Sequence, residues 1–328
     1  MTQSILFLFL GCTPESTPKS KDIIEDTAND DINPSPEQCD ITIAGTIPSD
    51  GGGAWFYRNP AIITFSEENP TVAFSVTDSA GSDVPVSFTW DDVRLNASVL
   101  PDSGSWNPSE NYSLTIELCG KSPSISFSTS EIGTPLEEDP STLVGNTYFI
   151  DLSSAEYSEP PGVGTLLSLY LDMPLLLGVK NVDATVIDFE AYLGYRDDVS
   201  PDWMAVDMDP WIFDGADFST QPFFAAYTEL LTIPYGSVDI PVHGFAIEGT
   251  FSSDASSIQK ATFTGLGDTS GMGPLMGFGN DPNAVCSLLG QYGIACLDCP
   301  DGAGTYCVRL TGEIDEAELL PNVDVVSQ

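Results

Sequence analysis

The chain has 328 residues, with 49 Asp and Glu against 9 Lys and Arg, which gives a formal net charge of −40 at pH 7. This length allows two or three ordinary domains. So strong an acid excess repels nucleic acid and anionic lipid surfaces, so we expect no nucleic-acid partner and no membrane binding through a basic patch.

A single histidine, His243, limits the catalytic sites that the chain can build. It lies in the β-like run IPVHGFAIEGTF, where we expect a packed or surface residue. The motifs GxSxG, HExxH, GxGxxG and GxxxxGK[ST] do not occur. We therefore predict that the protein is not an enzyme, and we assign no catalytic residue.

Six apolar residues precede Gly11 and Cys12 near the start of the chain, in ILFLFLGC. They are too few to span a bilayer, which needs about 20. The run resembles the end of a bacterial lipoprotein signal peptide, which implies a signal peptide over 1–12 and a lipid on Cys12. In such proteins an aspartate after the cysteine marks inner-membrane retention; Thr13 stands there instead, which implies an outer-membrane anchor, facing the periplasm or the surface. A buried strand with an ordinary cysteine is the alternative.

Residues 13–38 are rich in Pro, Ser, Thr, Asp and Glu, with Ile23, Ile24 and Ile32 as their only large apolar residues. Such a stretch buries too little apolar area to offset the entropy of ordering it. We predict a disordered tether that holds the folded domains clear of a membrane.

Short β-branched and aromatic runs alternate with turn residues over 39–132, the first predicted domain. Seven short strands in about 90 residues favour a β-sandwich. The runs are CDITIAGTIP (39–48), PAIITFSE (60–67), TVAFSVTD (71–78), VPVSFTW (84–90), NASVLPD (96–102), NYSLTIELC (111–119) and SISFSTS (124–130).

Five pieces of this domain, in order, resemble bacterial Ig-like domains of the S-layer type: residues 48–52, 62–67, 106–108, 111–116 and 127–129. The resemblance implies an Ig-like spacer or adhesion module and carries over no catalytic residue. Cys39 opens the first strand and Cys119 closes the sixth, at the same pole of such a sandwich. We therefore predict a disulfide between them in an oxidising compartment.

An acidic linker, placed at 133–140, leads to a second domain over 141–328. Its β-like runs, some continuously apolar and some alternating, predict a larger antiparallel barrel or sandwich, so that the whole protein is all-β. One short helix is predicted over 281–293, with Asp281 as its cap and Gly293 at its end. This domain resembles only uncharacterised regions of other bacterial lipoproteins. The runs are GNTYFIDL (145–152), GTLLSLYLD (164–172), PLLLGVK (174–180), ATVIDFEAYLGY (184–195), SVDIPVHGFAIEGTFSSD (237–254) and SIQKATFTGLGDT (257–269).

Four cysteines crowd the end of the chain: Cys286, Cys296, Cys299 and Cys307. A zinc site and a redox CxxC are the functional alternatives, but the outer cysteines are single and CLDC follows a helix rather than a strand. Disulfides are the default for an exported chain, and three pairings are possible. The tight loop PDGAG favours Cys286–Cys296 with Cys299–Cys307.

The most site-like stretch is the predicted loop over 196–219, which combines seven aspartates with four large aromatic residues. Carboxylates beside aromatic rings suit a glycan site or a calcium-assisted one, so Ca²⁺ is the one cofactor considered. The competing interpretation is a surface loop whose aromatic residues anchor it to the barrel. The candidate ligand residues are Asp202, Trp203, Asp207, Asp209, Trp211 and Asp214.

Together these features predict a non-catalytic cell-surface lipoprotein in which an Ig-like spacer presents a β-rich domain for adhesion, envelope structure or contact with a glycan or protein partner. A lipoprotein that binds a glycan, a small apolar molecule or Ca²⁺ is the alternative. An envelope hydrolase using paired carboxylates ranks third, because no specific acid and base stand out.

Overall fold

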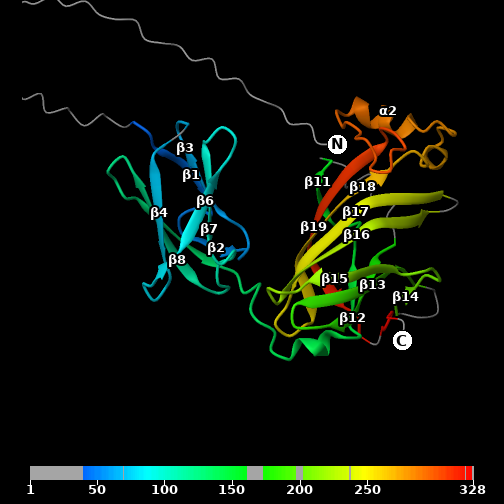
Figure 1. The fold of residues 1–328 in the computed structure, drawn as a ribbon, viewed down its shortest axis with the longest axis horizontal. Coiled ribbons are helices and arrows are strands. Elements are labelled where there is room, and N and C mark those ends of the chain that lie inside the picture. The colour runs from blue at the N-terminus through cyan, green and yellow to red at the C-terminus, as the bar shows by residue number, and fades with distance from the viewer. Residues whose placement is uncertain are drawn as a thin grey trace, which may run out of the picture. The chain divides into compact units, whose positions relative to one another are not determined.

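The computed structural model describes residues 40–68, 70–160, 173–196, 202–235, 238–321 and 323–326. The predictions for residues 1–38, including lipidated Cys12, for Cys39 and for a strand at 164–172 lie outside these ranges. In the described part, β-strands dominate and one short α-helix occurs, so the predicted all-β fold is confirmed (Figure 1). No helix in these ranges is long and apolar enough to cross a bilayer.

Residues 43–129 form two sheets that share one core. The first sheet has the order β1-β3-β7-β6 and the second the order β2-β9-β8-β4-β5. The strands are β1 (Ile43–Ile47), β2 (Gly52–Trp55), β3 (Ala61–Phe65), β4 (Val72–Thr77), β5 (Asp83–Val84), β6 (Val86–Trp90), β7 (Asn96–Pro101), β8 (Asn111–Leu118) and β9 (Ser124–Thr129).

Alternation of side chains builds the core between these two sheets. In β8, every second residue from Tyr112 to Leu118 is buried, while the residues between them are half-buried or exposed. Trp106, from the loop before β8, is almost fully buried in this core and packs edge-on against Phe127. Its indole nitrogen donates to the carbonyl of Asn59 at 2.8 Å, so the one polar atom of this ring is satisfied.

Two strands of this sandwich were not predicted. Strand β2 lies in the glycine-rich stretch that the sequence marks as a turn, and it pairs in parallel with β9, with Gly52 opposite Phe127. Glycine has little preference for extended structure, so this strand depends on the partner that reaches it from much later in the chain. Strand β5 is only two residues long and pairs at the end of β4.

The second part of the chain forms a closed antiparallel barrel of eight strands in the order β10-β12-β13-β15-β16-β17-β18-β19. The barrel closes because β10 pairs with both β12 and β19. Short strands β11 and β14 pair at its margins with β19 and β13. The bounds are β10 (Thr147–Ile150), β11 (Glu156–Glu159), β12 (Leu175–Val182), β13 (Val186–Tyr195), β14 (Met204–Ala205), β15 (Trp211–Asp217), β16 (Phe223–Tyr235), β17 (Val238–Phe251), β18 (Ser257–Asp268) and β19 (Cys307–Leu319).

The interior of the barrel is packed with side chains. Tyr148, Phe189, Phe213, Phe224 and Phe251 are all fully buried in one cluster. An eight-stranded barrel is just wide enough for side chains to fill it. The described side chains of the interior therefore form a packed core.

Part of the predicted loop over 196–219 is in fact strand. Residues Trp211–Asp217 form β15, which pairs with β13, and Met204–Ala205 form β14. The many aspartates and the proline of this segment favour a loop prediction. The segment is nevertheless a strand, because its inner face is apolar, with Phe213 and Ala216 buried. Strands β16 and β19 were also not predicted.

The Cys-rich end carries the helix and both predicted disulfides. Helix α2 (Ala284–Gln291) begins three residues later than predicted, because the Asp281 carboxylate accepts from the Asn283 N–H in a turn before the first helical residue. The pairs are Cys286–Cys296 and Cys299–Cys307, as predicted. Cys119 is also disulfide-bonded, and the partner predicted for it, Cys39, lies outside the described ranges.

Candidate functional site

In the loop predicted to bind a ligand, both tryptophans are in contact with the barrel. The Trp203 ring lies 4.8 Å from the ring of Phe149, and the Arg196 guanidinium lies 4.5 Å above it. Trp211 is in β15, where its indole nitrogen donates to the carbonyl of Thr232 at 3.2 Å and its ring packs on the core. These contacts are those of anchoring residues.

The aspartates of the predicted set do not converge. Asp207, Asp209 and Asp214 are exposed, and none belongs to the three-residue group of metal-ligand type found among the described residues. Asp202 and Trp203 do line an open hollow of about 510 Å³ beside the segment 323–326. Calcium binding by this stretch stays a prediction that nothing in the described geometry supports.

A second hollow, of about 590 Å³, lies on the outer face of β16, β17 and β18 beside the Cys-rich end. Two large apolar side chains line it and remain exposed, Tyr227 at 59% and Leu230 at 51%. The side chains in the lining that can ionise include Glu229, His243, Asp301 and Arg309. Apolar surface beside a few convergent polar groups is the usual composition of a binding site.

An irregularity in β17 directs His243 into this hollow. Buried Val242 and Phe245 lie three residues apart rather than two, and the register with β18 shifts between His243 and Ala246. Gly244 has φ +59°, a conformation that costs glycine little. Bulges of this kind redirect side chains at functional edges of sheets.

His243 meets two carboxylates there. One donor atom from each of His243, Asp268 and Asp301 lies within 4.8 Å of the other two. His243 pairs with Leu266 across β17 and β18, and Asp268 is two residues further along β18, so it faces the same side. Asp301 comes from the loop between Cys299 and Cys307. The β-like run around His243 predicts only a packed or surface residue, and nothing in that run points to either aspartate.

Burial in this cluster is uneven. Asp268 is only 6% exposed, the His243 side chain is 12% exposed, and the Asp301 side chain is 49% exposed. The His243 Nε2 atom has almost no solvent-accessible surface and no hydrogen-bond partner among the described residues, since its distance of 3.9 Å to Asp301 Oδ2 is too long for a hydrogen bond. A buried polar atom without a partner is rare and calls for a physical explanation.

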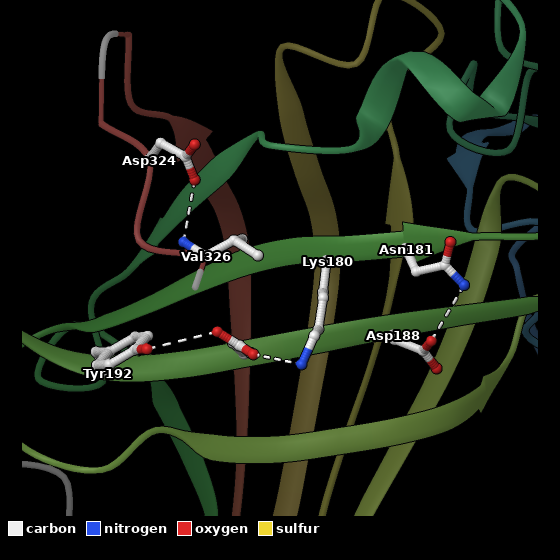
Figure 2. Close-up of polar contacts among 7 residues, drawn as sticks. Lys180, Asn181, Asp188, Tyr192, Asp324 and Val326 are labelled. Atoms are coloured by element: carbon white, nitrogen blue, oxygen red, sulfur yellow. Dashed lines mark hydrogen bonds and ion pairs between the residues drawn. The ribbon is translucent and has the colours of Figure 1, made fainter. Parts of the chain in front are cut away.

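A separate polar cluster lies on the outside of β12 and β13 and has a structural role. The Lys180 ammonium pairs at 2.6 Å with Glu190, which is 1% exposed, and the Tyr192 hydroxyl lies 3.5 Å from the same carboxylate (Figure 2). The chain near its end covers this face: a Cβ on Gly178 would lie 2.8 Å from Val325 and from Val326. The ion pair therefore neutralises a carboxylate beneath a packed segment.

The hydrogen bond from Lys180 to Glu190, together with nearby carboxylates, raises the pKa of Lys180 above its usual 10.5. A group with a raised folded-state pKa contributes its full stabilisation below the unfolded-state pKa and loses it as pH rises through the folded-state value. We expect Lys180→Met to lower the melting temperature at neutral pH, because a buried carboxylate loses its partner. The difference in melting temperature between Lys180→Met and the wild-type chain should become smaller above pH 10.5. Thermal melts followed by circular dichroism measure this difference.

Lys121→Met is the control for this prediction, because Lys121 is exposed and forms no ion pair within the described ranges. It should leave the melting temperature unchanged at every pH. If the gap for Lys180→Met stays constant above pH 10.5, the charge of Lys180 is not the source of its effect.

No protein-family model matches this chain, and no curated protein sequence matches it significantly. Function therefore has to be inferred from the geometry and chemistry of the chain itself. Of the two hollows, the one beside His243 has the stronger features, because its aromatic ring is exposed and its ionisable groups converge. We call it the His243 hollow.

Proposed function

We propose that this chain is a non-catalytic binding protein of the bacterial cell surface, anchored in the outer membrane through a lipid on Cys12. In this proposal the tether over 13–38 and the Ig-like sandwich act as spacers, and the barrel is the binding domain. The resemblance of residues 5–12 to a lipoprotein signal and the resemblance of the sandwich to S-layer-type Ig-like domains support the location and the spacer role.

The single observation that carries the binding role is the exposed pair Tyr227 and Leu230 in the His243 hollow. The described side chains of the barrel interior form one packed cluster, whereas this outer hollow combines apolar surface with Glu229, Asp301 and Arg309. A ring with an apolar face and a polar tip, surrounded by carboxylates and a guanidinium, suits a ligand that is itself apolar on one face and rich in hydroxyl groups. We therefore propose a surface saccharide as the ligand.

The test is a glycan array probed with the full chain, followed by titration of the best saccharide. Tyr227→Ala should weaken binding about tenfold or more, the usual cost of removing an aromatic hot spot from a binding surface. Tyr292→Ala is the matched control, since Tyr292 is 76% exposed and does not line the hollow. It should leave the affinity unchanged.

Two results would contradict the proposal. If the wild-type chain binds no saccharide on the array, the proposed ligand class is wrong. If Trp203→Ala abolishes binding and Tyr227→Ala does not, the site is the loop that contains Asp202 and Trp203, and the assignment to the His243 hollow is wrong.

A further inference from the structure

We infer that His243, Asp268 and Asp301 form a binding site for a divalent transition-metal ion of the Zn²⁺ class. The inference deepens the proposed function, because it assigns a metal ion to one wall of the His243 hollow. It does not depend on the saccharide, however, since the three residues and their geometry stand apart from Tyr227 and Leu230.

The distances in this cluster match a metal site better than a hydrogen-bonded one. Zinc lies about 2.0–2.2 Å from nitrogen and oxygen ligands, so tetrahedral ligand atoms are roughly 3.4 Å apart. The 3.9 Å between His243 Nε2 and Asp301 Oδ2 exceeds a hydrogen bond but is close to that ligand spacing. The three ligand atoms lie within 4.8 Å of one another, so they must draw closer by up to about 1.4 Å to share one ion.

The charges in the cluster call for a cation. Asp268 is almost fully buried, and neither it nor Asp301 forms an ion pair with a lysine or arginine among the described residues. Burying a carboxylate without a compensating charge is expensive. A divalent ion balances the two carboxylates and gives the buried His243 Nε2 atom the partner that it lacks.

Two of the three ligands are already held in place. The Asp268 carboxylate accepts from the Ser270 N–H at 2.8 Å, and the Asp301 carboxylate accepts from the Ala303 N–H at 2.9 Å. Outer hydrogen bonds of this kind orient metal-binding carboxylates. The Cys299–Cys307 disulfide closes the loop that carries Asp301, and Cys307 pairs directly with Asp268 across β18 and β19. The loop is thereby fastened beside the strand that supplies the second ligand.

The donor set selects the class of metal. Calcium takes six to eight oxygen ligands, whereas one imidazole nitrogen with two carboxylates suits Zn²⁺ or a neighbouring first-row ion. Three protein ligands leave a coordination position free, and His243 and Asp301 both line the hollow. A ligand in the hollow can therefore contact the metal through that position.

The test uses the full chain with its disulfides formed, stripped by a chelator and titrated with Zn²⁺ by calorimetry in excess Ca²⁺. The excess Ca²⁺ suppresses the diffuse cation binding expected at a net charge of −40. We expect about one tight Zn²⁺ per chain. His243→Gln and Asp301→Asn should each weaken it by more than about 100-fold, beyond the usual cost of losing an outer-shell partner.

Glu229→Gln is the matched control, because Glu229 lines the same hollow and its loss removes one charge without removing a ligand. It should leave Zn²⁺ affinity unchanged. The single histidine adds a direct readout: in a chain labelled only at histidine, the one imidazole signal should shift on addition of one equivalent of Zn²⁺.

Three results would overturn the inference: no tight Zn²⁺ binding, an equal loss in Glu229→Gln and Asp301→Asn, or an imidazole signal that does not respond to bound Zn²⁺. The proposed function fails separately. Tyr227→Ala should retain Zn²⁺ binding whether or not the chain binds a saccharide, and a chain that binds a saccharide but shows no tight Zn²⁺ binding would retain the first proposal and lose the second.

Discussion

Replacing Phe251 by alanine should lower the free energy of unfolding by about 3–5 kcal/mol, the usual cost of removing a buried phenylalanine ring. Phe251, the last residue of β17, is fully buried in the core of the barrel. Its ring contacts those of Tyr148, Phe218 and Phe224, with centroids 5.4, 5.9 and 5.2 Å away. These neighbours stand on separate parts of a closed barrel, so they cannot move inward together to fill the space that the ring leaves.

The measurement is chemical denaturation of the full chain, with unfolding followed by circular dichroism and by tryptophan fluorescence. Phe278→Ala removes the same ring from a position that is 46% exposed, and it should change the free energy of unfolding by less than about 0.5 kcal/mol. Equal losses in the two variants would show that the barrel interior is less tightly packed than its burial indicates.

Removing the Cys299–Cys307 disulfide by changing both cysteines to serine should cost about 2–4 kcal/mol, the typical contribution of a disulfide. The two cysteines are 8 residues apart, and the loop that they close carries Asp301. Once opened, the loop gains conformational freedom, and Asp301 loses its fixed position beside His243 and Asp268. We therefore expect a second effect, the loss of most of the affinity for Zn²⁺.

The matched control is the double change of Cys286 and Cys296 to serine, which opens the other disulfide of the same region. Its cysteines are 10 residues apart, so the loss of stability should be similar. None of the three proposed metal ligands lies between them, so Zn²⁺ affinity should be retained. If both double variants lose Zn²⁺ equally, general loosening of the Cys-rich end explains the effect better than the position of Asp301.

The strands that could be predicted are those whose own residues indicate both that the segment is extended and which side chains point into the core. Strand β8 alternates buried and exposed positions, and β13 places Ile187, Phe189 and Ala191 inside while Asp188 faces out. Short-range information also sufficed for the two disulfides of the Cys-rich end, because a tight loop brings Cys299 and Cys307 together.

Two of the strands that were not predicted, β2 and β15, depend on pairing with strands elsewhere in the chain. Strand β2 extends in spite of its glycines because β9 pairs with it, and β15 extends in spite of its aspartates because β13 does. The face of β15 that points inward is apolar, but the composition of the whole segment hides it. Local propensity is too weak to override such long-range pairing.

The cluster of His243, Asp268 and Asp301 could have been found only in part from the sequence. A hairpin turn between the runs at 237–254 and 257–269 places His243 and Asp268 on neighbouring strands. The face of the sheet on which His243 lies, however, depends on the irregularity at Gly244. Such an irregularity cannot be read from the sequence, and a one-residue shift moves a side chain to the opposite face. Asp301 joins the cluster only through the disulfide-closed loop.

The all-β class, the short helix, the two disulfides of the Cys-rich end and the extreme negative charge could all be predicted without a structure, because each depends on composition or on residues close together in the chain. Three features became visible only in the folded chain: the barrel closes through β10 and β19, the described side chains of its interior pack into one cluster, and the single histidine lies beside two aspartates. Closure of the barrel and assembly of the His243 cluster bring together residues that are far apart in the chain. The register of the strands that carry these residues is set by the packing of the whole core rather than by local preference.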